Sequence, residues 1–307
     1  MKRRLLADLF EVRPSNGVLK EALVIIASAA PRLDPSRIVH AYRTLEDLYS
    51  GAFPGYQSCN TGYHDLNHAV HTFLAMARLI QGATAAAEKM TDREILLALI
   101  AAAFHDAGYI QALEDRKGTG AKYKTGHEQR SIDWLDRHAA VLGLTPNDVR
   151  SVACLIRCTD MSTNIGEVPF THGSKELLGR MLAGADLLAQ LSEPVYLEKL
   201  LLLHKEDLES GERRYGNEID TLRKANEFYE FFKRHLAQTL PQADRFLMLH
   251  FETRWNIRDN LYREAITRQH AYLSTVLQAS EESILMLLRR RRTLKALSGL
   301  GEDSGSD

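Results

Sequence analysis

The sequence predicts an all-α protein. Apolar residues recur at the spacing of helix turns through most of the 307 residues, whereas the alternating pattern of strands is almost absent. Glycine and proline interrupt this pattern, for example at Pro31, Gly143 and Pro241, and divide it into pieces of helix length. Both observations favour a protein built from many helices joined by loops.

Each expected helix is bounded by such breaks. Two have a recognisable start, because Asp34 before Pro35 and Thr145 before Pro146 have the form of an N-cap followed by proline at the first helical position. In chain order, the expected helices cover residues 17–30, 36–50, 65–82, 92–107, 127–142, 146–159, 175–190, 194–209, 217–239, 244–277 and 280–297. Two irregular stretches, 114–126 and 162–174, are either lids over a site or solvated connectors.

We expect a single helical domain over residues 1–297. The motifs that carry chemistry lie at about 60–210, and the C-terminal helices at 217–297 either pack back on the core or mediate a homodimer. Four consecutive arginines, Arg289–Arg292, are either a solvated helix end or a contact for an anionic partner. Residues 298–307 are small and acidic, so we expect a disordered tail.

Composition indicates a soluble globular protein. Apolar residues make up 45% of the chain, charged residues 26%, and the formal net charge is −1, so no general attraction to nucleic acid or membranes is expected. No run approaches the roughly 20 apolar residues of a membrane-spanning helix, and no secretory signal is recognisable. The three cysteines form neither a disulfide nor a zinc-finger pattern, which favours a reduced, cytoplasmic location.

Histidine and aspartate residues in two places indicate a metal site. His64 and His68 stand four residues apart, which puts them on one face of a helix. His105 and Asp106 end the apolar run at 95–104, and burying such a pair is unfavourable unless a cation compensates it. The imidazoles of His68 and His105 and the carboxylate of Asp106 are ligand types that divalent metals take in hydrolases.

Asp186 is the expected fourth ligand. It is a lone carboxylate in an apolar helical run, and its alternative role is to pair with an arginine or cap a backbone group. His64 can lie near a metal without binding it, and an imidazole there can protonate a leaving alkoxide. The alternative for His64 is a core histidine bonded to a backbone carbonyl, and His71, one turn beyond His68, competes for either role.

Four short motifs resemble those of a known enzyme family. Residues 63–69, Tyr-His-Asp-Leu-Asn-His-Ala, are similar to the Tyr-His-Asn-x-x-His-Ala signature of class I cyclic-nucleotide phosphodiesterases, which belong to the HD superfamily of metal phosphohydrolases. Residues 103–106, 159–162 and 184–187 resemble the family's His-Asp, Thr-Asp-Met-Ser and Ala-Asp-Leu motifs. The four occur in the family's order over about residues 60–210, and this order makes the resemblance specific.

The resemblance implies a compact multi-helix bundle of the HD type with two divalent metal ions. It assigns four ligands to the first ion, typically zinc: His68, His105, Asp106 and Asp186. Asp106 would bridge to a second ion, usually magnesium or manganese. A hydroxide between the ions would attack the phosphorus of a 3′,5′-cyclic nucleotide, and His64 would protonate the departing 3′-oxygen to release the 5′-monophosphate. The implied partner is therefore a small nucleotide.

The chain departs from the family's pattern at several positions. Asp65 stands where the signature has asparagine, and Tyr109 where the family has a second histidine. His127 and Glu128 stand in for a Glu-x-x-His-His segment, so that His127 is expected to bind the second metal or contact phosphate, with Glu128 as its supporting partner. Asp160, in the Thr-Asp-Met-Ser motif, is expected in a similar supporting role.

Purine recognition also departs from the family. The family places a glutamine shortly before a phenylalanine, and the best match, Phe228 with Phe231, puts Ala225 at the glutamine position. Two alternatives therefore stand beside the cyclic-nucleotide phosphodiesterase. One is an enzyme with the same metals that acts on another nucleotide, a phosphomonoester or an alarmone. The other is a catalytically inactive nucleotide-binding regulator.

Overall fold

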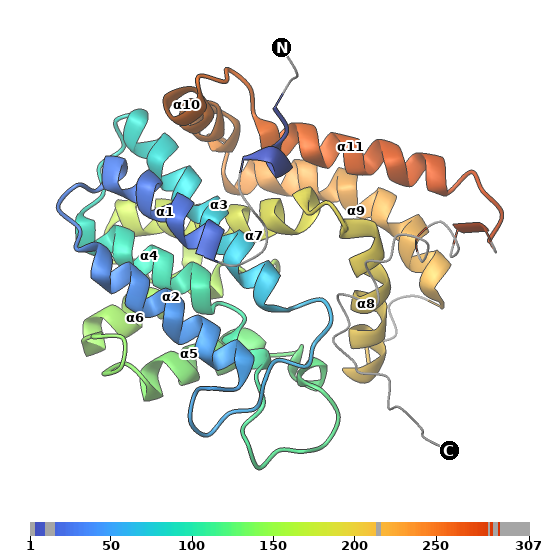
Figure 1. The fold of residues 1–307 in the computed structure, drawn as a ribbon, viewed down its shortest axis with the longest axis horizontal. Helices are drawn as coiled ribbons and strands as arrows, with labels where there is room; N and C mark the ends of the chain where they lie inside the picture. Colours follow the sequence, from blue (N-terminus) through green and yellow to red (C-terminus); the bar gives the residue numbers. More distant parts are fainter. Residues whose placement is uncertain (1–3, 10–15, 213–215, 282, 285–287, 289–307) are drawn as a thin grey trace.

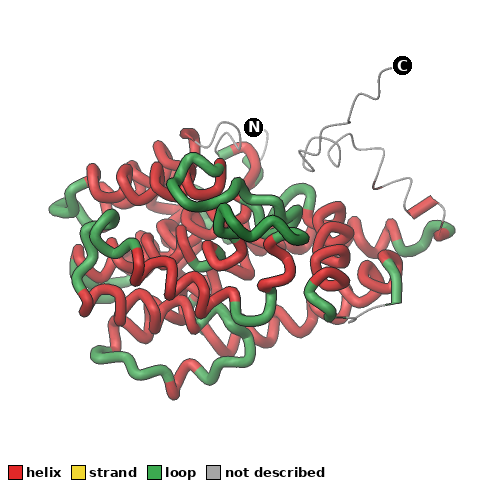
Figure 2. Tube along the Cα trace, turned by 90° about the horizontal axis from the view of Figure 1, so that it is seen from below, coloured by secondary structure: helices red, strands yellow, loops and turns green. Residues whose placement is uncertain are grey.

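The protein is built from helices and loops. The structure, a computed structural model, describes residues 4–9, 16–212, 216–281, 283–284 and 288. Figures 1 and 2 show these residues as packed helices joined by loops, and none of them belongs to a strand. An isolated bridge pairs Tyr56 with Ala112. The prediction of an all-α protein is confirmed.

Eleven α-helices and four short 3-10 helices make up the described part of the chain. The α-helices are α1 (Asn16–Ala29), α2 (Pro35–Ser50), α3 (Leu66–Ala85), α4 (Asp92–Phe104), α5 (His127–Arg137), α6 (Pro146–Arg157), α7 (Gly173–Ser192), α8 (Tyr196–Glu209), α9 (Glu218–Thr239), α10 (Ala243–Trp255) and α11 (Leu261–Val276). The 3-10 helices are η1 (Leu6–Asp8), η2 (Ala107–Tyr109), η3 (Gly120–Tyr123) and η4 (Ile165–Glu167).

Both predicted cap-and-proline starts are present. The Asp34 carboxylate accepts the N–H of Ser36 at 2.9 Å and starts α2, with Pro35 at the first helical position. Thr145 and Asp148 form a reciprocal capping box at the start of α6. Each cap satisfies backbone donors that the first turn of a helix leaves without a partner, so these two starts are determined by neighbouring residues.

The expected helix at 244–277 is wrong, because the structure divides it into α10 and α11. Asn256 adopts the left-handed conformation, with φ of 53°, and ends α10. Asn260 then caps α11, since its side-chain oxygen accepts the N–H groups of Tyr262 and Arg263. The apolar spacing continues across this turn, so periodicity alone does not reveal it.

Part of the expected C-terminal structure lies outside the described residues. This holds for most of the expected helix at 280–297, for Arg289–Arg292 and for the tail at 298–307. Of the helices that the structure describes, none combines the length and the apolar character needed to cross a lipid bilayer.

Helix α3 lies at the centre of the bundle. It packs against α1, α4, α7 and α10, and nearly every side chain from His68 to Ala83 is buried (Figure 1). A helix that is apolar on all sides has to be covered by its neighbours. Gly82 allows one close contact, because a Cβ there would lie 1.8 Å from the carbonyl oxygen of Phe246 in α10. Helix α3 therefore holds its residues on a tightly packed support.

We expect Gly82→Ala to lower the free energy of unfolding by about 1–3 kcal/mol, because the added methyl group overlaps backbone rather than a flexible side chain. Urea denaturation of the purified variants measures this change. Gly173→Ala, at the first residue of α7, is the matched control, since nothing lies within 4 Å of a Cβ there. Unchanged stability of the Gly82 variant would contradict the close packing of α3 on α10.

Candidate metal centre

Four side chains converge between α3, α4 and α7. His68 lies in the first turn of α3, His105 and Asp106 directly follow α4, and Asp186 lies in α7. His68 Nε2 lies 3.3 Å from Oδ2 of Asp106 and 3.0 Å from Oδ1 of Asp186. His105 Nε2 lies 3.3 Å and 3.6 Å from the same two oxygens. The structure thus brings together the four residues that the sequence predicts as ligands, which we call the metal cluster.

The donor atoms of the metal cluster fit a divalent cation. His105 Nδ1 donates to the carbonyl oxygen of Ala102 at 3.0 Å, which leaves the Nε2 lone pair facing the cluster. Within the described part of the chain, His105 Nε2 and Asp106 Oδ2 are buried without a hydrogen-bond partner. One ligand atom each of His68, His105 and Asp106 lies within 4.8 Å of the others. This buried group could hold a metal ion, which would satisfy atoms that are otherwise unfavourable to bury.

The pKa shifts show how strongly the groups of the metal cluster interact. Burial by itself lowers the pKa of His68, but the contacts with Asp106 and Asp186 outweigh burial and raise that pKa to about 9. Burial by itself raises the pKa of Asp106, but the facing imidazoles, His105 foremost, hold it well below its usual range. Protons on the imidazoles thus compensate the buried carboxylates, and a divalent cation can replace them.

His127 approaches Asp106 from the start of α5. Its Nδ1 donates to the carbonyl oxygen of Lys124 at 2.8 Å, and its Nε2 lies 3.3 Å from Oδ1 of Asp106. That oxygen is not the one that faces the two other histidines, so the carboxylate has imidazoles at both of its oxygens. Gly108 makes the approach possible, because a Cβ there would lie 2.0 Å from the carbonyl oxygen of His127.

The remaining candidates of the sequence motifs take different positions. Glu128 Oε2 lies 3.3 Å from Nδ1 of His127. Asp160 lines a cavity that His68, Asp106 and Asp186 also line. Its carboxylate accepts the N–H and the hydroxyl of Ser162 at 2.8 and 2.7 Å and makes no contact with a residue of the metal cluster among those described. His71 is outside the metal cluster and lines a second cavity, and burial lowers its pKa to about 3.

His64 is held by a carboxylate that lies outside the sequence motifs. Its Nδ1 lies 2.6 Å from Oε2 of Glu206 in α8, and Oε1 of Glu206 accepts the N–H of Tyr63 at 2.6 Å. Glu206 is 4% exposed and follows the apolar residues 200–203. In the sequence Glu206 stands among His204, Lys205 and Asp207, so the signal that singles out Asp186, a lone acid in an apolar run, does not point to it. With Nδ1 bound, Nε2 is the nitrogen of His64 that is left for chemistry.

Tyr109, which stands where the phosphodiesterase pattern has a second histidine, contacts two histidines. Its ring stacks on His64 with 4.2 Å between centroids and on His127 with 4.6 Å. Its hydroxyl lies 3.5 Å from Nε2 of His64. Because Tyr109 is 1% exposed and its ring contacts both imidazoles, whose own centroids lie 6.2 Å apart, it helps to hold the two rings in place.

A buried lysine accounts for the aspartate at position 65. Asp65 caps α3 and accepts the N–H of His68 at 2.9 Å, a role that asparagine also fills in helices. Its charge is compensated by Lys199 of α8, whose Nζ lies 2.9 Å from Asp65 and 3.3 Å from Glu193. Burial by itself lowers the pKa of Lys199, but the two carboxylates outweigh burial and raise it. The charged cap holds the backbone of His68 in place.

We expect Lys199→Met to destabilise the protein by about 3–5 kcal/mol, because it leaves Asp65 and Glu193 buried without their cation. Adding Asp65→Asn to that variant should restore part of the stability, since asparagine still caps α3 and carries no charge. Urea unfolding of both single variants and the double variant measures the coupling. Strictly additive losses in the double variant would contradict the ion pair.

Three residues of the metal cluster, His68, Asp106 and Asp186, line one cavity of about 480 Å³ together with His64. Side chains of α3, α5, α7, α8 and α9 line it, together with loop residues before α5 and after α6. Neutral and apolar side chains also contribute to its walls: Gln190, Leu200, Leu203, Ala225 and Phe228. The cavity therefore combines charged side chains, most of them acidic, with apolar surface.

The loop at 114–126 is fastened to α8, the helix that holds Glu206. The hydroxyl of Thr119 donates to Glu209 at 2.7 Å, and Lys124 pairs with Asp207. The end of this loop, from Lys124 to Gly126, lines the cavity, so it is placed to contact a substrate. Of the described residues at 162–174, Ser162 alone lines the cavity.

The sequence belongs to a family whose description names no activity. No curated protein matches it. The family model described as Npun_R2479-like matches residues 50–271, which is more than half of the chain and includes the metal cluster, His64, Glu206 and His127. The chain is therefore a member of the Npun_R2479-like family.

Proposed function

We propose that this protein is an HD-type, metal-dependent phosphodiesterase that hydrolyses a 3′,5′-cyclic nucleotide to the 5′-monophosphate. The observation that carries the proposal is the position of His64. Its imidazole, held by Glu206, lines the same cavity as His68, Asp106 and Asp186 of the metal cluster. Hydrolysis of a phosphodiester needs an activated water, stabilisation of charge on the phosphoryl group, and an acid for the leaving oxygen. This cavity offers residues that would hold metal ions for the first two needs and an imidazole for the third.

The residues of the metal cluster are those that would hold the metals. Two imidazoles with two carboxylates suit zinc as the first ion. Oδ1 of Asp106 and Nε2 of His127 offer donors for a second ion, for which magnesium or manganese fits a carboxylate and water. Bound there, the ions would lower the pKa of a coordinated water and neutralise charge on the phosphoryl group.

His64 is the acid of this proposal. Glu206 accepts the Nδ1 proton, which fixes the orientation of the ring. The proton on Nε2 is then available to the 3′-oxygen, a poor leaving group that departs far more readily once protonated. Tyr109 holds the ring by stacking, so that Nε2 keeps its direction through the reaction.

The cavity suits a nucleotide in size and lining. Its volume of about 480 Å³ falls within the range of small-molecule sites, about 300–1,000 Å³. Phe228 and Leu200 offer apolar surface for a base, and Gln190 offers an amide for hydrogen bonds to its edge. Ala225 also lines the cavity but cannot replace the glutamine of the resembling family, so neither adenine nor guanine is favoured.

The direct test is turnover of cyclic AMP and cyclic GMP by the purified protein with added manganese or magnesium, with Asp106→Ala as the blank. We expect release of the 5′-monophosphate that needs the metal and is absent in the variant, together with a lower metal content of the variant by elemental analysis. Metal binding without turnover of either substrate would contradict the cyclic-nucleotide substrate. Absence of both metal and turnover would contradict the enzyme.

We expect His64→Gln to lower kcat by about 10²- to 10⁴-fold while metal content stays unchanged, because the variant loses a proton donor and no ligand. Glu206→Gln should also lower kcat with unchanged metal content, since its role is to orient His64. His40→Gln is the matched control, an exposed histidine of α2 whose Nε2 lies 2.7 Å from the carbonyl oxygen of Val141. Loss of metal in the His64 variant would show that His64 is a ligand instead.

A further inference from the structure

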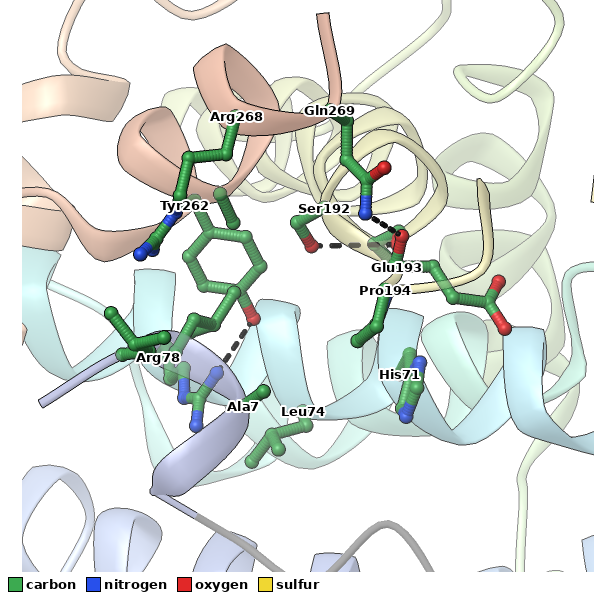
Figure 3. Close-up of a pocket in the computed structure, with 14 residues that line it drawn as sticks. Ala7, His71, Leu74, Arg78, Ser192, Glu193, Pro194, Tyr262, Arg268 and Gln269 are labelled. Carbon is green, nitrogen blue, oxygen red and sulfur yellow. Dashed lines mark hydrogen bonds between the residues drawn. The ribbon is translucent and has the colours of Figure 1, made fainter. Parts of the chain in front are cut away.

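A second cavity lies against α3 and α7, two of the helices that surround the metal cluster. It has a volume of about 210 Å³ and shares no lining residue with the first cavity. Figure 3 shows it between α3, the end of α7, α11 and the short helix η1. On α3 its first lining residue is His71, one turn beyond His68, and on α7 it is Ala189, one turn beyond Asp186.

The walls of this second cavity combine apolar surface with positive charge. Figure 3 shows the guanidinium groups of Arg78 and Arg268 on one side, beside the ring of Tyr262. Arg78 is 1% exposed and donates to the Tyr262 hydroxyl at 2.9 Å. The Arg268 side chain is 47% exposed and makes a long ion pair of 3.6 Å with Glu264, so it lies at the opening. The apolar part of the wall is formed by Leu5, Leu6, Ala7, Leu74, Ala189, Pro194 and Ala265.

Size and charge together define the ligand. A cavity of about 150 Å³ is large enough for benzene, so a volume of about 210 Å³ suits one ring, or a short chain, with one polar group. Guanidinium groups match carboxylates in charge and geometry. Glu193 also lines the cavity, but Figure 3 shows its carboxylate pointing away from the arginines, and its Oε2 lies 3.3 Å from Lys199. The arginine side of the cavity therefore favours an anion.

Glu193 connects the second cavity with the metal cluster. Lys199, its partner, lies 2.9 Å from Asp65, and Asp65 accepts the N–H of His68 at 2.9 Å. Glu193 and Lys199 are 7% and 1% exposed, so water and salt screen their interaction little. A ligand that packs against Glu193 therefore acts on the ion pair between Lys199 and Asp65, the residue that caps α3 and accepts the N–H of His68.

We propose that the second cavity binds a small organic acid, a carboxylate with an apolar body of about one ring, and that its binding is coupled to metal binding at the metal cluster. The ligand fills space between the turns of α3 and α7 that follow His68 and Asp186. By linkage, the metal changes the affinity for the acid by the same factor as the acid changes the affinity for the metal.

Isothermal titration of the full-length protein with benzoate and with hexanoate tests the site, with benzyl alcohol as the neutral analogue. We expect at least one acid to bind the unmodified protein. Relative to that acid, benzyl alcohol should bind about tenfold more weakly or not at all, and the acid should bind the Arg268→Gln variant with a similar loss of affinity. Arg263→Gln is the matched control, because Arg263 is on the same helix but does not line the cavity. Ala265→Leu, which fills the cavity, should abolish binding and leave metal content unchanged.

The coupling is tested by repeating the titration at saturating manganese, and by titrating manganese with and without the bound acid. We expect the two affinities to change by one common factor, and Glu193→Gln to bring that factor closer to one. Failure of both acids to bind, or binding that Arg268→Gln and Ala265→Leu leave unchanged, would overturn the site. Acid affinity that is equal with and without manganese would overturn the coupling.

Discussion

Burial of the Asp106 carboxylate between α3, α4 and α7 is the constraint on which the rest of the site depends. Asp106 is 3% exposed, and nitrogen atoms of His68, His105 and His127 each lie 3.3 Å from one of its oxygens. An ionised carboxylate in such surroundings persists when cations or donors face it closely. The three imidazoles come from three parts of the chain, so the packing of the helices has to deliver all of them to one point.

A second set of contacts orients these side chains. The carbonyl oxygens of Ala102 and Lys124 accept the Nδ1 protons of His105 and His127, which turns the Nε2 atoms of both rings toward Asp106. Helix α8 supports the other side of the site. It carries Lys199, which compensates the cap of α3, and Glu206, which orients His64. One helix that contributes no residue to the metal cluster thus supports both the first turn of α3 and the ring of His64.

Two positions differ from the phosphodiesterase pattern that the chain resembles, and the side chains around each of them explain how it fits the site. The charge that Asp65 adds at the cap of α3 is compensated by Lys199, which the sequence places on a distant helix. Tyr109, which stands where the resembling pattern has a histidine, stacks on both His64 and His127. Both changes alter how the site is held together and leave the four residues of the metal cluster in contact.

The sequence by itself determined the helical class, the capped starts at Asp34 and Thr145, and which acids stand in apolar helices, because these signals are local. The turn at Asn256 was not predictable from periodicity, since the apolar spacing runs through it while a left-handed residue ends the helix. The tertiary structure alone decided the partners of the buried charges. Glu206 stands 142 residues from His64, and Lys199 stands 134 residues from Asp65. Spacing along the chain carries no information about such pairs, because the partner of a buried charge depends on which helices pack against each other.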